Sequence, residues 1–283
     1  MSETDFSERI SCLISIYKKD IPADFHNALE SIVNQTCLPA EIVIVQDGPI
    51  SDDLQEVVNH FRQKTLSIRQ IKLEENMGRG RALAIALPEC KYELVAIMDG
   101  DDIAKLDRFA VQLAFFKQNQ NALIVGGWIE EFSVTPGDLA KIRSVPLESS
   151  SIRKIVKRRN PFNQVTVMFR KSVAIAAGGY RHNPGFEDYD LWLRMLKQNG
   201  MVANLGKVLV DVRVGNGMLS RRRGFGYLTS ELRFLKAVYE ENSIGLSDLI
   251  FSCAIRSVIR LIPTGIVKFV YSNFLRKKKI HKE

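Results

Sequence analysis

The chain has 283 residues, 46% hydrophobic and 25% charged, with 40 Lys and Arg against 32 Asp and Glu. This is the composition of a globular protein with one large domain or two small ones, and it excludes a disordered chain, a collagen-like repeat and a disulfide-stapled miniprotein. The net charge of +8 is unevenly placed, because residues 251–283 hold eight bases and one acid, which leaves 32 bases and 31 acids in the first 250 residues. The charge therefore belongs to a basic tail on a nearly neutral body.

In the first 120 residues, apolar runs of strand length alternate with helical patterns. The strand-like runs cover 10–17, 41–48, 67–73 and 94–102, and the helical patterns lie at 28–33, 52–63, from about 80, and at 105–118. This alternation is typical of βαβ units, which build a parallel sheet. Ligands bind beyond the carboxyl ends of the strands in such sheets, so Asp47 and Asp99, at two strand ends, are candidate site residues.

After residue 120 the alternation loosens, which indicates a mixed sheet. Further strands are predicted at 122–132, 163–171 and 208–215, and helices at 150–159, 186–200 and 220–241, with two more over 246–276 separated by Pro263. We predict an α/β catalytic domain over 1–215 and a helical, basic extension over 216–283 packed on it.

The cysteines and histidines are scattered without metal-ligand spacing. Free thiols in a reducing compartment are therefore expected, and a zinc site is not. The start of the chain does not resemble a signal peptide, and no stretch of 18 uncharged apolar residues is present. A cytoplasmic protein without a transmembrane helix is expected.

The sequence MDGDD ends the apolar run at 94–102. Residues two apart in an extended chain point the same way, so Asp99 and Asp101 are expected to share a face. Neighbouring carboxylates repel unless a cation lies between them, and a divalent ion with oxygen ligands fits. A polar turn after a strand is the alternative explanation.

A second strand end carries Asp47 in the sequence VIVQDG, and Tyr17 follows the first strand. Asp47 belongs either to a simple Asp-Gly turn or to a nucleotide site, where its carboxylate accepts a nucleobase N–H and Tyr17 offers a flat face for stacking. Farther on, Gly78 and Gly80 lie with Arg79 and Arg81 at a helix start, a place suited to an anion. Arginines in contact with solvent alone are the alternative, favoured for Arg79.

The sequence GFEDYDLWLRM places Glu187, Asp188 and Asp190 at the start of a helix. Acids at this position cap free N–H groups and suit the helix dipole, which is the expected role of Asp190. Two adjacent acids after a glycine and an aromatic residue also provide a candidate general base. An aspartate is ionised at neutral pH, so this role requires positioning more than a shifted pKa.

Taken in order, these motifs resemble family 2 glycosyltransferases of the GT-A fold, a Rossmann-like nucleotide-binding mixed sheet flanked by helices. The resemblance spans roughly residues 10–215, and the segments IYKKD, QDGPISDDL and NPFNQVTVMFRKS are similar to bacterial enzymes of O-antigen and capsule synthesis, often β1,3-galactosyl- or glucosyltransferases. It implies a nucleotide-sugar half at about 1–120 and an acceptor half at about 121–215.

The resemblance also implies roles for individual residues. Asp47 and Tyr17 would hold the uracil of a UDP-sugar, Asp99 would contact the ribose, and Asp101, with Asp99, would hold Mn²⁺ or Mg²⁺. Asp188 would be the catalytic base of an inverting transfer that gives a β-linked product. The acceptor would be a sugar linked to undecaprenyl diphosphate.

Further candidates for the site are less central. Arg81 is expected to contact the nucleotide-sugar, and Asp102 and Glu187 are additional acids beside the two motifs. Gln164 stands where related sequences often carry His and is a candidate acceptor contact. Arg222, in the triplet 221–223, lies near where related enzymes close over the diphosphate.

Two other functions stay open at this point. A sugar-1-phosphate nucleotidyltransferase would share the metal and the fold class, but it usually has a glycine-rich loop after the first strand, and IYKKDIPADF has no glycine. A non-enzymatic protein that binds nucleic acid or a membrane surface would explain the basic tail, but no nucleic-acid module is recognisable, and no nucleic-acid partner is expected.

The tail has an amphipathic pattern. Arg256 and Arg260 lie four residues apart, among apolar residues, and a second apolar stretch ends in four consecutive bases at 276–279. The tail is either a packed helical cap or an anchor on the cytoplasmic face of the bacterial inner membrane. In the anchor, the apolar face would enter the headgroup boundary and the bases would contact anionic lipid.

Overall fold

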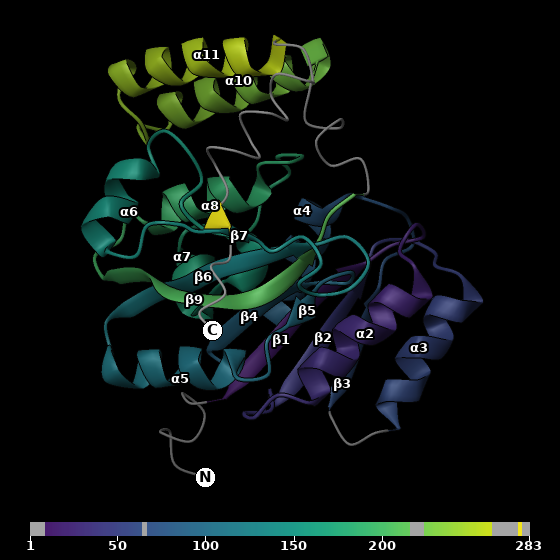
Figure 1. The fold of residues 1–283 in the computed structure, drawn as a ribbon. Helices are drawn as coiled ribbons and strands as arrows, with labels where there is room; N and C mark the ends of the chain where they lie inside the picture. Colours follow the sequence, from purple (N-terminus) through teal and green to yellow (C-terminus); the bar gives the residue numbers. More distant parts are fainter. Residues whose placement is uncertain (1–8, 64–66, 216–223, 262–276, 279–283) are drawn as a thin grey trace.

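The amino-terminal half of the chain forms a parallel sheet with helices on both faces (Figure 1). This computed structural model describes residues 9–63, 67–215, 224–261 and 277–278. The strands β1 (Ile10–Ile16), β2 (Glu41–Gln46), β3 (Ile68–Lys72) and β4 (Leu94–Asp99) lie parallel in the order β4-β1-β2-β3. They alternate along the chain with α2 (Pro22–Val33), α3 (Asp52–Arg62), α4 (Arg79–Glu89) and α5 (Arg108–Gln118). The predicted parallel arrangement is confirmed.

Side chains alternate between the two faces of this sheet, as the pleat of a strand requires. On β1, Leu13 joins a core cluster that also holds Leu83 of α4 and Trp192, whereas its neighbours Cys12 and Ile14 join a second cluster with residues of α2, α3 and α5. Both faces of each central strand are therefore buried. This double burial explains why the strands read as continuous apolar runs rather than as alternating ones.

The second half of the chain extends the sheet with strands of mixed direction. It contains β5 (Ile103–Ala104), β6 (Ala122–Phe132), β7 (Lys141–Arg143), β8 (Met168–Arg170) and β9 (Met201–Arg213), with helices α6 (Ser149–Ile155), α7 (Lys171–Ala176) and α8 (Glu187–Met195). β8 runs antiparallel to β4, and β9 pairs with both β6 and β5. The sequence prediction missed β5, β7 and α7, because these elements are too short to show a recognisable hydrophobic pattern.

The prediction of one strand over 163–171 is wrong. Residues Gln164–Thr166 form a 3₁₀ turn, and only Met168–Arg170 pair as a strand. Tertiary hydrogen bonds hold the turn: Asn163 Nδ2 donates to the carbonyl of Gly127 at 2.8 Å, and the amide of Gly127 donates to Thr166 Oγ1 at 2.9 Å. These long-range bonds replace the ladder that the apolar pattern predicts.

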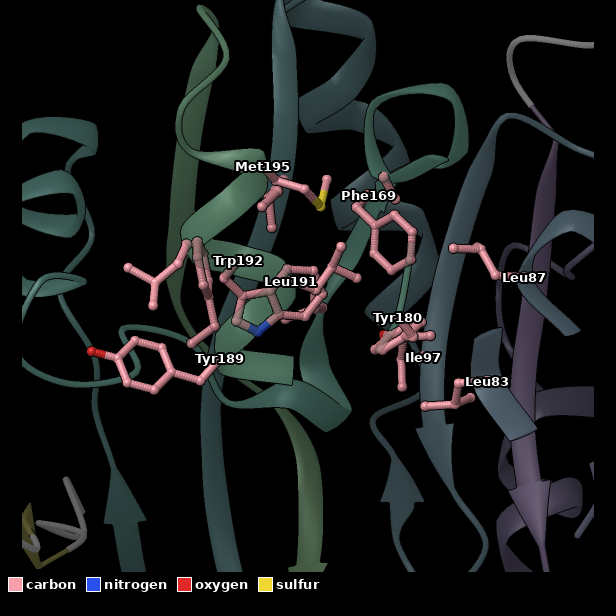
Figure 2. Packing of buried hydrophobic residues seen from close by; sticks show 14 of the residues in the cluster. Leu83, Leu87, Ile97, Phe169, Tyr180, Tyr189, Leu191, Trp192 and Met195 are labelled. Carbon is pink, nitrogen blue, oxygen red and sulfur yellow. The ribbon is translucent and has the colours of Figure 1, made fainter. Parts of the chain in front are cut away.

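Helix α8 is fixed to the sheet by aromatic packing. The Trp192 side chain is fully buried and meets the rings of Phe162 and Phe169 edge to face, with centroids 5.9 and 5.6 Å apart. Figure 2 shows Trp192 and Phe169 in this cluster, with Leu83 and Leu87 of α4 near its other end. Because the helix is held along its length, the position of its first residues is fixed as well.

A pair of helices packs on α8 from outside. In α10 (Gly224–Glu240), Phe234 stacks on Phe186 with ring centroids 4.8 Å apart, and α11 (Leu246–Leu261) lies outermost, against α10 (Figure 1). The second predicted tail helix falls on residues 262–276, outside the described residues, whereas Lys277–Lys278 (β10) pair antiparallel with β7. The division of the chain at residue 215 stays a prediction.

Arg256 and Arg260 do not take the lipid-facing position that the anchor alternative gives to the bases of the tail. Both guanidinium groups turn toward α10, where Arg256 lies 3.0 Å and Arg260 2.8 Å from the carboxylate of Glu231, which is 3% exposed. The spacing of four residues does put them on one helical face, but that face is the packed one. In the described part of the chain, no helix has the length and apolar character needed to cross a bilayer.

Candidate active site at the carboxyl edge of the sheet

Three of the predicted site residues lie together where the parallel strands end. Tyr17 directly follows β1 and Asp47 directly follows β2, and the backbone N–H of Asp47 donates to the carbonyl of Ile16 at 2.8 Å. Asp99, the last residue of β4, is in register with Ser15 of β1. The pairing of three neighbouring strands thus brings one aromatic ring and two carboxylates to a single edge.

The Asp47 carboxylate organises the loop that leads into α4. Its Oδ1 accepts the backbone N–H of Met77 at 2.7 Å, and its Oδ2 accepts that of Gly78 at 3.0 Å. The loop passes very close, since a Cβ on Gly48 would lie 2.7 Å from the backbone nitrogen of Asn76, and Gly48 has φ +83°. Each carboxylate oxygen has a second lone pair, so Asp47 can still accept a hydrogen bond from a ligand.

After Asp99, the MDGDD segment contains two further carboxylates of different accessibility. Asp101 is half-buried, and its burial, followed by the nearby charge of Asp99, raises the pKa of Asp101 to about 6. Asp102 is buried and turns away from the edge, where its Oδ1 accepts the backbone N–H of Arg213 at 2.9 Å. The predicted strand over 94–102 ends at Asp99, and the chain turns at Gly100. Asp102 therefore connects this turn to β9.

A further acid, Asp20, belongs to the same cluster and was missed by the sequence analysis. Its Oδ2 accepts the backbone N–H of Tyr17 at 2.9 Å. Burial raises the pKa of Asp20 to about 7, and the charges of Asp101 and Asp99 act in the same direction. Its position three residues after Tyr17, beyond a strand end, was the available signal.

These carboxylates suit a divalent cation. Hard carboxylate oxygens are the ligands that Mg²⁺ and Mn²⁺ prefer, and a cation near Asp99 and Asp101 would offset the repulsion between their charges. Among the described residues, no group of three or more His, Cys, Asp or Glu side chains is arranged as a complete metal site. The donor set fits an ion that binds through one or two carboxylates and takes its other ligands from a substrate.

Arg79 connects this edge to the start of α8. Its guanidinium forms an ion pair with Asp99, and both side chains are partly exposed. Burial alone would lower the pKa of Arg79, but the charges of Asp99, Glu187 and Asp188 raise it above the ordinary value. Arg81, the arginine selected from the sequence, is exposed on α4. Arg79 is therefore the basic residue that faces both groups of acids.

The approach of α4 to the segment before α8 depends on a glycine. A Cβ on Gly80 would lie 2.7 Å from the carbonyl oxygen of Arg181, which leaves no space for a side chain. Gly80 thus has a packing role, in contrast to the anion-binding role considered from the sequence. It brings Arg79, one residue earlier, within reach of the acids at 187 and 188.

The three acids at the start of α8 have different surroundings. Asp190 is buried and paired with Arg194 at 2.6 Å, and Glu187 is 7% exposed, with burial raising its pKa. Asp188 is half-buried, and its Oδ2 accepts a hydrogen bond from Asn160 Nδ2 at 2.7 Å. Of the three, Asp188 is the one that solvent and ligands can reach. Asn160 begins the segment NPFNQVTVMFRKS, from which sequence reasoning selected Gln164 instead.

Several buried polar atoms near Arg79 form no hydrogen bond of good geometry within the described ranges. They are Arg79 Nε, Gln164 Nε2, Tyr180 Oη and Glu187 Oε2, although Gln164 and Tyr180 lie close enough to interact with each other. Tyr180 lies among them, since its pKa is raised by burial and also responds to the charges of Arg79, Asp188 and Glu187. Buried polar atoms without partners indicate a place for a polar ligand or water. Arg222 lies outside the described residues.

Comparison with known proteins gives the same family as the motifs. The family model described as "Glycosyl transferase family 2" matches residues 11–177. A Haemophilus influenzae protein named "Uncharacterized glycosyltransferase" is 42% identical over 95% of this chain and 100% of its own length. The Escherichia coli "UDP-Gal:alpha-D-GlcNAc-diphosphoundecaprenol beta-1,3-galactosyltransferase" is 36% identical over 97% of this chain and 99% of its own. The resemblance stated from the sequence is confirmed.

A solved structure shows the same fold at low identity. The mannosyltransferase PcManGT of Pyrobaculum calidifontis, in complex with GDP-Man and Mn²⁺, matches with a TM-score of 0.60 at 14% identity, over 93% of this chain and 79% of its own. The predicted GT-A fold is confirmed. Nucleotidyl transfer and non-enzymatic binding of nucleic acid or a membrane surface, the two alternatives from the sequence, are not the function of this family.

The raised pKa of Asp20 predicts how stability depends on pH without metal. The ordinary pKa of an aspartate is 3.8, and that of Asp20 in the folded state is about 7. Between these two pH values the folded state binds more protons at Asp20 than the unfolded state does, so the contribution of Asp20 to stability falls as pH rises. Replacing it (Asp20→Asn) should raise the free energy of unfolding at pH 8 and change it little at pH 4. Urea denaturation in EDTA at both pH values measures this difference.

Glu56→Gln, which removes an exposed acid of α3, is the matched control and should leave the pH dependence unchanged. A pH dependence for Asp20→Asn identical to that of the wild type would contradict the assignment of Asp20 to the carboxylate cluster.

Removing the guanidinium at position 79 (Arg79→Met) should destabilise the metal-free protein. Breaking a fully buried ion pair costs about 3–5 kcal/mol; since Arg79 and Asp99 are partly exposed, we expect about 1–3 kcal/mol. Added Mn²⁺ should stabilise the variant more than the wild type, because Asp99 has lost its competing cation. Thermal denaturation with and without Mn²⁺ measures both effects.

The neighbouring exposed arginine provides the control for this experiment. Arg81→Met should change stability by less than about 0.5 kcal/mol, with or without Mn²⁺. Equal effects of the two substitutions would show that Arg79 has no special place between the acids.

Proposed function

This chain belongs to glycosyl transferase family 2, and from that premise we propose that it transfers galactose or glucose from a UDP-sugar to a lipid-diphosphate-linked sugar. The main observation behind the proposal is the position of Arg79. Its guanidinium forms an ion pair with Asp99 at the end of β4, and it also interacts electrostatically with Glu187 and Asp188 at the start of α8. A nucleotide-sugar bound at the strand ends would therefore present its reacting carbon toward Asp188.

The donor nucleotide would lie along the edge formed by β1, β2 and β4. Tyr17 supplies a ring for the uracil, and Asp47 supplies an acceptor for its N–H group, while Asp99 lies toward the ribose. Arg79 provides a fixed positive charge beside the diphosphate, where charge-assisted hydrogen bonds are strong. A GT-A neighbour binds GDP-Man, so the fold does not determine the base. The preference for UDP is supported by the name of the 36% identical relative.

Mn²⁺ or Mg²⁺ would be held by Asp101, with Asp99, and when bound would neutralise charge on the departing diphosphate. The protein's own contribution at this point is to hold two carboxylates close together at a partly buried edge. Because burial and Asp99 raise the pKa of Asp101 to about 6, protons compete for the same oxygens in acid. At neutral pH the Asp101 carboxylate is therefore largely ionised and able to hold a cation.

Asp188 is proposed as the base for the acceptor hydroxyl. The hydroxyl oxygen bonds to the anomeric carbon as the bond from that carbon to the UDP oxygen breaks, and the hydroxyl proton passes to the Asp188 carboxylate. The hydrogen bond from Asn160 orients this carboxylate. One in-line displacement inverts the configuration, so an α-linked donor gives a β-linked product. The leaving diphosphate needs no proton, which explains a site with a single base.

The acceptor is proposed by similarity. The relative from Escherichia coli is named for a GlcNAc-diphosphoundecaprenol acceptor and a β1,3 linkage, and it covers nearly the whole of this chain. An acceptor of this kind would place the enzyme on the cytoplasmic face of the bacterial inner membrane, in contact with anionic lipid. The donor half would be residues 1–120, the acceptor half 121–215, and the extension 216–283.

Replacing the base isosterically (Asp188→Asn) should abolish transfer while UDP still binds. Loss of a general base costs about 10²–10⁴-fold in rate. The Asn160 hydrogen bond can persist, because the new amide oxygen also accepts. UDP release from UDP-galactose and UDP-glucose with a synthetic GlcNAc-diphosphate-lipid acceptor measures the rate, and calorimetry measures UDP affinity.

Asp101→Asn is the complementary variant, since it should weaken Mn²⁺-dependent UDP binding rather than the chemical step alone. Near wild-type transfer by Asp188→Asn would contradict the proposed base. Failure of the wild type with every nucleotide-sugar would contradict the proposed reaction.

A further inference from the structure

The polarity of α11 is inverted relative to that of a helix on the surface of a soluble domain. Between residues 246 and 260, its exposed residues are Leu246, Ser247, Ile250, Phe251, Ala254, Ile255, Val258 and Ile259. The six large apolar side chains are each 40–61% exposed. Their spacing places them on one face of the helix, so they form a continuous stripe. We call this set the α11 stripe.

The charged residues of α11 point the other way. Arg256 and Arg260 both pair with Glu231 on α10, and Asp248 pairs with Arg158 at 2.8 Å. Ser252, which is 2% exposed, lies on the same packed side. A helix that turns its ion pairs inward and its apolar residues outward suits an apolar environment better than water. No charge interrupts the exposed face between 246 and 260.

A basic ridge adjoins the α11 stripe. Lys154, Lys157, Arg158 and Arg159, at the end of α6 and just after it, are all exposed. The Arg158 guanidinium lies 4.5 Å from the ring centroid of Phe251, so the ridge and the stripe are in contact. An open hollow of about 670 Å³ beside the ridge is lined by residues that include Lys154, Arg158 and Asp248. Positive charge beside an apolar helix face is the pattern of proteins bound to anionic membranes.

We propose that the α11 stripe and the basic ridge dock this protein on an anionic bilayer, with the apolar side chains at the acyl boundary and the ridge on lipid phosphates. A second copy of the chain fits the same face less well, since a symmetric contact would bring two basic ridges together. The chain after α11 continues with the apolar and basic sequence IPTGIVKFV, in keeping with a bilayer at this end.

The proposed docking face lies next to the candidate base. The ridge ends at Arg159, and the next residue, Asn160, donates the hydrogen bond to Asp188. A lipid-linked sugar emerging from the bilayer beside the ridge would therefore enter on the Asp188 side, away from the nucleotide edge of β1 and β2. This last point rests on the proposed function, whereas the docking face itself rests on exposure and charge alone.

The test is flotation of the full chain with vesicles of phosphatidylglycerol and phosphatidylethanolamine. The stripe variant Ile250→Gln, Ile255→Gln, Val258→Gln removes exposed apolar groups and should lower the bound fraction at least tenfold. The control Leu38→Gln, Leu106→Gln, Val134→Gln removes three exposed apolar groups elsewhere and should float as the wild type does. Equal melting temperatures establish that both variants are folded.

A ridge variant separates the two parts of the surface. Lys154→Gln, Lys157→Gln, Arg159→Gln should lose most binding to anionic vesicles and reduce the preference over neutral phosphatidylcholine vesicles. Arg158 is kept because it pairs with Asp248. The matched control is Arg62→Gln, Lys72→Gln, Lys91→Gln, which removes three exposed bases from the other half of the chain.

Transfer to a short-chain, water-soluble acceptor distinguishes this proposal from the proposed function. The stripe and ridge variants should keep that activity while losing flotation. Unchanged flotation of the stripe variant would overturn the docking proposal, and so would a wild-type dimer in solution that the stripe variant dissociates. If the wild type has no transferase activity but floats with vesicles in a stripe-dependent way, the proposed reaction is contradicted and the docking proposal is not.

Discussion

The repulsion among carboxylates at the carboxyl edge of the sheet is the constraint on which the site depends. Burial raises the pKa of Asp20 and of Asp101, and the charge of Asp99 raises both further. Arg79, in the first turn of α4, forms an ion pair with Asp99 that offsets part of this repulsion. A metal ion can replace Arg79 as the partner of Asp99, and a diphosphate can replace Asp99 as the partner of Arg79. Both new contacts would be stronger than the ion pair that they replace.

Arg79 also connects two parts of the candidate site that are distant in the sequence, because it interacts with acids of both. The strand ends come from the first hundred residues, and the candidate base comes from α8, whose first turn is set by Trp192 packing between Phe162 and Phe169. Gly80 allows α4 to approach the loop before α8 closely enough for Arg79 to act on both. The outer pair of helices then packs on Phe186, two residues before that candidate base, and turns an apolar face outward. The candidate nucleotide edge, the candidate base and the proposed membrane face thus follow one another across the molecule.

Local signals in the sequence were sufficient for the parallel half of the fold and for the residues at its strand ends. Buried strands read as apolar runs, and Asp47 and Asp99 follow such runs directly. Arg79, Asp20 and Asn160 were not predicted as site residues, because their roles depend on contacts between segments 20 to 100 residues apart. The orientation of α11 was likewise hidden, since a helical period gives two faces without saying which one packs. Glu231, a buried acid on α10, pairs with the arginines of α11 and so determines which face of α11 packs on the protein.

A crystal structure with an unreactive UDP-sugar analogue, Mn²⁺ and a soluble acceptor tests the central claim most directly. The account predicts uracil on Tyr17 beside Asp47, Mn²⁺ on Asp101, Arg79 released from Asp99 toward the diphosphate, and an acceptor hydroxyl about 2.6–3.2 Å from the Asp188 carboxylate. A nucleotide bound away from the β1 and β2 ends, or an anomeric carbon facing away from Asp188, would contradict it.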